Sequence, residues 1–96
     1  MEVEKFDLSI EALAEQVGLP LRTIRFYIAR GLLPGPGSRG KAATYGEEHL
    51  LRLQLIRRLS ESRVPLDEIR TRLAGLSLAD LRVLLAEEER QGAELL

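Results

Sequence analysis

Residues Leu8 to Tyr45 read LSIEALAEQVGLPLRTIRFYIARGLLPGPGSRGKAATY, and this stretch decides the fold. It opens with a short amphipathic helix: Ser9 is a typical N-cap, and Gly18 is a typical residue to follow the last turn. A second helix is predicted to start at Pro20, since proline is tolerated in a first turn, and to end at Arg30 and Gly31. The apolar positions that recur at helical spacing are Ile10, Leu13, Ala14 and Val17 in the first helix, and Leu21, Ile24 and Ile28 in the second.

The second helix carries its polar chemistry on the face opposite Ile24. Arg22, Arg25, Phe26 and Ala29 are predicted to point into solvent, whereas Tyr27 lies nearer the apolar face and is expected to be partly buried. An arginine on an exposed helix face can bind guanine O6 and N7 through two parallel hydrogen bonds, or bind a phosphate. The alternative is that the arginines only solubilise the helix.

A glycine- and proline-rich loop follows, from Pro34 to Tyr45. Its composition excludes a helix and predicts a two-stranded ribbon with its tip near residues 37–40. Arg39 and Lys41 lie at that tip, where a basic ribbon can follow a phosphate strand or enter a minor groove. A flexible connection is the alternative. Helix, turn, helix and basic ribbon together predict a mainly α, winged helix-turn-helix fold with double-stranded DNA as partner.

Three further helices are expected. The third runs from about Gly46 to Ser62, and the fourth from Leu66 to a stop at Gly75; this pair forms a helical hairpin against the first two helices. A fifth candidate covers residues 77–96, with Ser77 as N-cap. The expected core residues are Leu50, Leu53, Ile56 and Leu59 in the third helix, and Leu66, Ile69 and Leu73 in the fourth; Arg52, Arg57 and Arg58 are expected elsewhere on the third helix.

Charge is unevenly distributed along the chain. The 96 residues carry a formal net charge of −1, but residues 20–65 hold nine basic side chains against three acidic ones. That segment is therefore at +6 and the remainder at −7. Such segregation lets one surface attract phosphate while the acidic rest limits indiscriminate association. A chance clustering of solvated charges is the alternative.

Composition and motifs exclude several other classes. Cysteine is absent, so neither a disulfide framework nor a thiolate metal site is possible. Residues 1–7 do not resemble a secretory signal, and no apolar run approaches the length of a membrane span. The single histidine, His49, has neither a nucleophile nor a metal-ligand set beside it and is predicted to be structural or solvated. Neither phosphate-binding glycine spacing occurs. We expect no catalytic residues, no metal and no cofactor.

Several of these segments together resemble the DNA-binding domain of MerR-family transcription regulators. They are residues 8–18, Thr23-Ile24-Arg25-Phe26-Tyr27, Gly31-Leu32-Leu33-Pro34, Tyr45 and Leu66-Asp67-Glu68-Ile69. The resemblance covers about three quarters of the chain. It implies a winged helix, a second wing between the third and fourth helices, and a C-terminal helix that pairs two subunits in an antiparallel coiled coil. Arg25, Phe26 and Tyr27 match positions that contact DNA in that family.

The chain departs from the family pattern in its wings. Ala42 and Ala43 stand where the wing commonly has Tyr-Arg, so Arg39 or Lys41 must replace the usual arginine contact. Arg63 stands where glycine is expected between the third and fourth helices. A residue other than glycine in a left-handed cap costs on the order of 1 kcal/mol. Because a second wing would approach phosphate at this point, Arg63 is a candidate contact.

The fifth helix has a leucine stripe that needs a partner. Leu78, Leu81, Leu84 and Leu85 share one face, and we predict that they form a dimer interface; packing onto their own domain is the alternative. The chain therefore divides into a winged helix-turn-helix domain at residues 1–76 and a dimerisation element at residues 77–96.

The residues and the resemblance predict a sequence-specific transcription regulator rather than an enzyme. The expected DNA-binding residues are Arg22, Thr23, Arg25, Phe26, Tyr27, Arg39, Lys41, Tyr45 and Arg63. A homodimer would bind an inverted-repeat promoter operator and distort it, with RNA polymerase as a further partner at the promoter. Cytoplasmic, nucleoid-associated localisation is expected, with no membrane contact. The competing hypothesis is a protein–protein interaction module that works through the leucine stripe.

Overall fold

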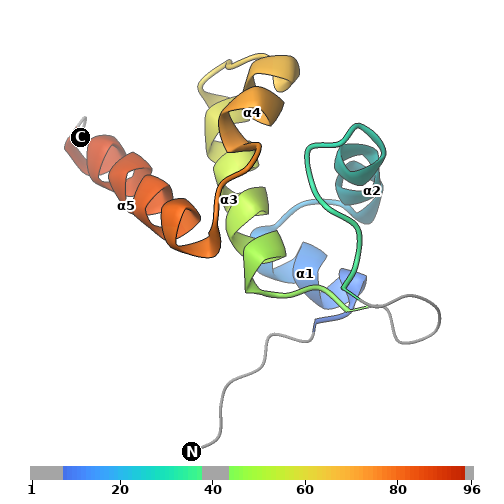
Figure 1. Ribbon diagram of the computed structural model, residues 1–96. Coiled ribbons are helices and arrows are strands. Elements are labelled where there is room, and N and C mark those ends of the chain that lie inside the picture. Colours follow the sequence, from blue (N-terminus) through green and yellow to red (C-terminus); the bar gives the residue numbers. More distant parts are fainter. Residues whose placement is uncertain (1–7, 38–43, 95–96) are drawn as a thin grey trace, which may run out of the picture.

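Five helices make up the fold in the computed structural model, which describes residues 8–37 and 44–94 (Figure 1). In chain order they are α1 (Ile10–Val17), α2 (Leu21–Ala29), α3 (Glu47–Glu61), α4 (Leu66–Leu73) and α5 (Leu78–Glu94). The mainly α class is confirmed, and every predicted helix is present. Within the described ranges the only β pairing is an isolated bridge between Leu8 and Tyr45, so a two-stranded wing is not shown.

The caps predicted for α1 are present, and α2 begins directly after Pro20. The Ser9 hydroxyl accepts a hydrogen bond from the Ala12 amide at 3.0 Å, and Gly18 closes α1 in the left-handed conformation at φ 72°. Gly31, at φ 78°, turns the chain after α2. A side chain at either glycine would be strained because L-residues rarely adopt this region. Only residues 18–20 separate α1 from α2, so the turn between these helices is short.

Helix α3 forms the centre of the domain, and α1, α4 and α5 pack against it (Figure 1). Leu53, Leu55 and Ile56 are fully buried, and Leu51 is nearly so. Sequence periodicity predicted a single apolar stripe, yet burial extends around much of the cylinder because α3 has neighbours on several sides. A helix that is apolar on several faces is expected at such a position.

The turns on either side of α4 both use left-handed residues. Arg63 adopts φ 67° before α4, as predicted for the position where glycine was expected, and Gly75 adopts φ 76° after it. Helix α5 then starts with a reciprocal cap: the Ser77 hydroxyl accepts from the Asp80 amide, and the Asp80 carboxylate accepts from the Ser77 amide, both at 3.1 Å.

The leucines of α5 are mostly used within the domain. Leu81 has no exposed surface and Leu85 is 8% exposed, both in the same core cluster as the α3 residues. Their assignment to a dimer interface is thus corrected: the alternative, packing onto their own domain, holds for these two. Leu78 and Leu84 keep part of their surface, and Val83 is 60% exposed. In Figure 1, α5 and α2 lie on opposite sides of α3.

Candidate nucleic-acid interface

Helix α2 divides cleanly into a buried and an exposed face. Ile24 has no exposed surface and Tyr27 is 8% exposed, so these side chains fix the helix to the core. The outward face carries the side chains that the periodicity predicted there, namely Arg22, Arg25, Phe26 and Ala29, and also Arg30. Thr23 lies between the two faces and is half-buried. The result is a solvent-facing strip that holds three guanidinium groups and one aromatic ring.

Arg30 also belongs to this strip, although its position in the sequence indicated only the end of the helix. Its guanidinium carbon lies 5.2 Å from the centroid of the Phe26 ring, which is itself 42% exposed. A cation at that distance is attracted by the face of the ring. The spacing of four residues between Phe26 and Arg30 was the available signal, because side chains so spaced meet on one helix face.

Tyr27 supports the strip from below. Its ring lies 5.9 Å from that of Phe26, between centroids, and burial raises the pKa of the Tyr27 phenol. A buried, uncharged ring is a packing element. The partial burial predicted for Tyr27 is therefore more complete in the structure, whereas the neighbouring Phe26 is the aromatic residue on the surface.

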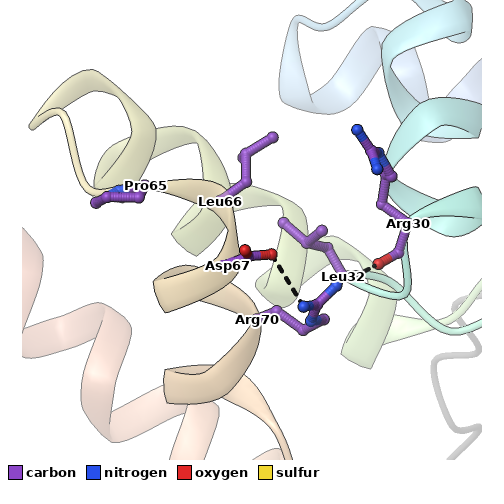
Figure 2. Close-up of a pocket in the computed structure, with 6 residues that line it drawn as sticks. All are labelled: Arg30, Leu32, Pro65, Leu66, Asp67 and Arg70. Carbon is purple, nitrogen blue, oxygen red and sulfur yellow. Dashed lines mark hydrogen bonds and ion pairs between the residues drawn. The ribbon is translucent and has the colours of Figure 1, made fainter.

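Helix α4 approaches the end of α2 across a groove of about 400 Å³ (Figure 2). Arg70 spans this groove: its guanidinium donates to the Arg30 carbonyl at 3.2 Å and to the Asp67 carboxylate at 2.9 Å. Pro65 lines the same groove, and the exposed Arg63 precedes it by two residues. The turn before α4 and the C-terminal end of α2 therefore border one surface.

The base of the predicted wing is held by backbone pairing and by His49. Leu8 and Tyr45 exchange two backbone hydrogen bonds of 3.0 and 2.9 Å, and the Gly37 amide donates to the Thr44 carbonyl at 2.9 Å. Tyr45 is 6% exposed, so its ring belongs to the core. The predicted tip residues, Arg39 and Lys41, lie outside the described residues.

His49 is structural, which is one of the two roles predicted for it. Its Nδ1 accepts the Gly46 amide proton at 2.9 Å, so Nε2 carries the ring proton and donates to the Gly35 carbonyl at 2.8 Å. The ring also packs edge-on against Tyr45, with centroids 5.0 Å apart. His49 thereby ties both ends of the wing segment to the first turn of α3.

Two of the basic residues in the positive segment bind backbone carbonyls of their own chain. Arg52 is 8% exposed and donates to the carbonyls of Leu73 and Leu76, and Arg57 donates to the carbonyl of Val17. Arg52 was expected away from the core face of α3 and is instead buried, whereas Arg57 is exposed, as expected. These bonds satisfy carbonyls at helix ends, which otherwise lack partners.

The remaining cations leave a positive surface on and beside α2. Within residues 8–37 and 44–91, the side chains of Arg22, Arg25, Arg30 and Arg63 are exposed and none forms an ion pair. Unneutralised guanidinium groups on one surface attract an anion such as phosphate. In the same part of the chain, no group of three or more acidic or histidine side chains is placed to hold a metal ion. None of the described helices combines the length and apolarity that crossing a membrane requires.

A capped first helix, a left-handed glycine turn and an exposed, cationic second helix define a helix-turn-helix protein. The family model described as MerR HTH family regulatory protein matches residues 8–76. The chain belongs to this family, as the sequence resemblance predicted.

Individual relatives agree. The chain is 39% identical over 67 residues to an HTH-type transcriptional regulator ZntR homolog of Haemophilus influenzae, covering 69% of this chain and 50% of that protein. It is 36% identical over 70 residues to the mercuric resistance operon regulatory protein of Serratia marcescens, covering 72% of this chain and 49% of that protein. The chain thus spans about half the length of the curated relatives it matches.

Solved structures show the same fold. The transcription regulator PbrR691 of Ralstonia metallidurans, solved in complex with lead(II), superposes with a TM-score of 0.63 at 30% identity, covering 92% of this chain and 78% of that one. The HTH-type transcriptional regulator SkgA of Caulobacter crescentus gives a TM-score of 0.67 at 27% identity, covering 97% and 68%. These relatives are named as transcription regulators and not as enzymes.

Proposed function

We propose that the chain binds double-stranded DNA sequence-specifically and regulates transcription, with α2 as the recognition helix. The observation that carries this proposal is the two-faced α2: Ile24 and Tyr27 anchor it, while Arg22 and Arg25 project into solvent without an ion-pair partner in the described part of the chain. A helix presented in this way fits the major groove, where arginine reads guanine through O6 and N7. Thr23 and Phe26 complete the base-facing set.

Phosphate contacts flank the recognition helix in this proposal. Arg30 stands at the end of the exposed strip, and Arg63 stands in the turn before α4, two residues before Pro65, which lines the groove beside Arg30. Arg39 and Lys41, outside the described residues, supply the wing contacts in this proposal. Contacts of this kind fix the position of the protein on the duplex and carry no sequence information themselves.

The regulator acts as a homodimer on an inverted-repeat promoter operator. Its interface uses the part of α5 that the domain leaves open: Val83 is 60% exposed, and with Leu76 and Leu84 it lines an apolar groove of about 550 Å³. Two recognition helices then enter successive major-groove faces. Distorting the operator changes how RNA polymerase meets the promoter, and its cost is offset by the wing contacts. The protein works in the cytoplasm, on the nucleoid.

The competing hypothesis of a protein-binding module has less support. It depended on an exposed leucine stripe along α5, and two of the four leucines in that stripe, Leu81 and Leu85, are buried against the domain. A module that works through α5 alone would leave the cationic strip on α2 without a role.

Selection of bound duplexes from a random pool, followed by affinity measurements on Arg25→Ala, tests the proposal. We expect the substitution to weaken binding to the selected duplex by roughly 1–3 kcal/mol, or about 5- to 150-fold, and to relax preference at one base pair. Arg90→Ala is the matched control, because Arg90 is exposed on α5, away from α2. Normal binding by folded Arg25→Ala protein would contradict the assignment of α2.

A further inference from the structure

Arg52 reaches from α3 into the connection between α4 and α5. Its guanidinium donates three hydrogen bonds: to the Leu73 carbonyl at 2.8 Å, to the Leu76 carbonyl at 3.0 Å, and to the Glu48 carboxylate at 2.8 Å. The first two acceptors end α4 and lie in the turn that starts α5. Because Arg52 is 8% exposed, these bonds are largely shielded from water, and removing them leaves buried carbonyls without partners.

A second arginine holds α5 itself to the same part of α3. Arg82 donates to both carboxylate oxygens of Glu47, at 2.7 and 3.1 Å, and this hydrogen bond and charge raise the pKa of Arg82. A two-pronged arginine–carboxylate pair restricts orientation as well as distance. Glu47 and Glu48 are neighbours in the first turn of α3, so both contacts originate from one point.

Without these contacts, the segment between α4 and α5 would allow α5 to change its direction. Only residues 74–77 separate α4 from α5, and Gly75 in the middle adopts φ 76°. Glycine has the largest range of backbone conformations, so a junction built on it does not by itself fix the direction of the next helix. Leu81 and Leu85 hold α5 against α3, but apolar packing restrains the angle of a helix less strictly than directional hydrogen bonds do.

We propose that Arg52 and Arg82 are positioning residues that set the direction of α5 relative to the DNA-binding face on α2. This inference rests on the proposed function, since α5 is there the dimerisation helix. In a dimer, the angle at which α5 leaves each domain determines how far apart the two recognition helices lie. The arginine pair therefore selects the half-site spacing that the dimer accepts.

Helix α5 is long enough for a small rotation at its junction with α4 to move its far end by several ångströms. Residues rise about 1.5 Å each along a helix, so Gln91 lies roughly 20 Å beyond Leu78, and a rotation of about 15° at the junction displaces it by about 5 Å. That displacement is a sizeable part of the rise of one helical turn of DNA, which is about 34 Å. A modest loss of angular restraint at the junction would thus blur half-site spacing.

Distance measurement between two spin labels tests the proposal without DNA. The chain has no cysteine, so Ala29→Cys on α2 and Gln91→Cys on α5, both exposed, give two unique attachment sites. Doubly labelled chain is diluted in excess unlabelled chain so that only distances within one molecule are recorded. We expect one narrow distance distribution in the parent chain, and a broadening of about twofold or a shift of about 5 Å with Arg52→Met and Arg82→Gln together.

Two further variants keep the result interpretable. Arg72→Gln removes an exposed ion pair to Glu68 within α4 and is expected to leave the distribution unchanged. If Arg52→Met does not fold, Arg82→Gln alone decides, because Arg82 is exposed and its loss removes only the Glu47 contact. The proposal would be overturned if the folded Arg52→Met and Arg82→Gln variants kept the distance distribution of the parent chain. It would also be overturned if Arg72→Gln changed the distance distribution equally.

The dependence on half-site spacing gives the functional result. Affinity is measured on selected duplexes whose half-sites are moved apart one base pair at a time. In the Arg52→Met and Arg82→Gln variants, the ratio of affinity at the best spacing to affinity at the other spacings should fall about tenfold. A uniform loss of affinity at every spacing would assign these arginines to stability alone. Failure of the proposed function would be seen separately from the spin-label distances. In that case the parent chain would bind no duplex, or Arg25→Ala would bind the selected duplex as tightly as the parent chain does.

Discussion

Replacing Arg63 by glycine should stabilise the fold while weakening DNA binding. Arg63 adopts φ 67°, where a residue with a Cβ is disfavoured by about 1–2 kcal/mol. Its side chain is exposed, so truncation removes no packing, and the backbone bond from its amide to the Ser60 carbonyl at 2.9 Å remains available to glycine. Glycine also gives the unfolded chain more conformational freedom, which cancels about 0.5–1 kcal/mol of the stability gained by relieving the strain. The net expectation is a gain of about 0.5–1 kcal/mol.

Thermal unfolding followed by circular dichroism measures this gain. In a domain of this size, 1 kcal/mol corresponds to roughly 4–8 °C in Tm, so the variant should melt about 2–8 °C higher. Arg63→Lys is the matched control, because it keeps both the charge and the left-handed strain and should melt with the parent chain. A variant with glycine that melts lower would refute the reasoning about strain.

Affinity for a selected duplex measures the other half of the prediction. If Arg63 neutralises one phosphate, the glycine variant should bind more weakly, with a log–log salt dependence shallower by about 0.9, and Arg63→Lys should retain both. A stabilised glycine variant with unchanged affinity and salt dependence would remove Arg63 from the interface.

The remaining predictions concern the turn, the wing and the buried phenol. Gly18→Ala should cost about 1–2 kcal/mol in urea unfolding, because φ is 72° and the new Cβ would lie 3.0 Å from Arg57 Nη1; Gly35→Ala, with open space around it, should not. Arg39→Ala with Lys41→Ala should lower affinity equally for selected and unrelated duplexes in fluorescence anisotropy, whereas a loss confined to the selected duplex would contradict a backbone role. Burial raises the pKa of Tyr27 above the value near 10 that it has in the unfolded chain. The neutral phenol therefore contributes fully to the free energy of unfolding below about pH 10, and this contribution falls as the pH rises through the pKa of the folded state. Tyr27→Phe should therefore lose less stability than the parent chain in melts above about pH 10, and equal losses would contradict this.

Local signals in the sequence were sufficient for the helices and for the exposed face of α2. Ser9, Gly18 and Ser77 act through atoms within four residues, so their caps could be read directly from the chain. The outward direction of Arg22 and Arg25 follows from the apolar period alone, since burying one face of a helix exposes the other. The strained position of Arg63 was predicted differently, from the family resemblance, which implies glycine at that position.

Contacts between distant residues could not be predicted in this way. Arg52 and Arg57 bind carbonyls 21 to 40 residues away, and nothing in their local sequence distinguishes them from solvated arginines. The leucines of α5 show the same limit: periodicity identifies an apolar face but not the surface that covers it. Leu81 and Leu85 proved to pack on α3 of their own chain. The charge count of residues 20–65 consequently overstated the positive surface.

Mapping the duplex onto the protein by NMR is the most direct test of the central claim that the outward face of α2 reads DNA. Backbone amide and arginine side-chain signals of the isotope-labelled chain would be followed while a selected duplex is added. The account predicts that the largest changes fall on residues 22–30 and on Arg63, and that the guanidinium signals of Arg22 and Arg25 change with duplex sequence. Changes concentrated on α5, with α2 unaffected, would contradict it.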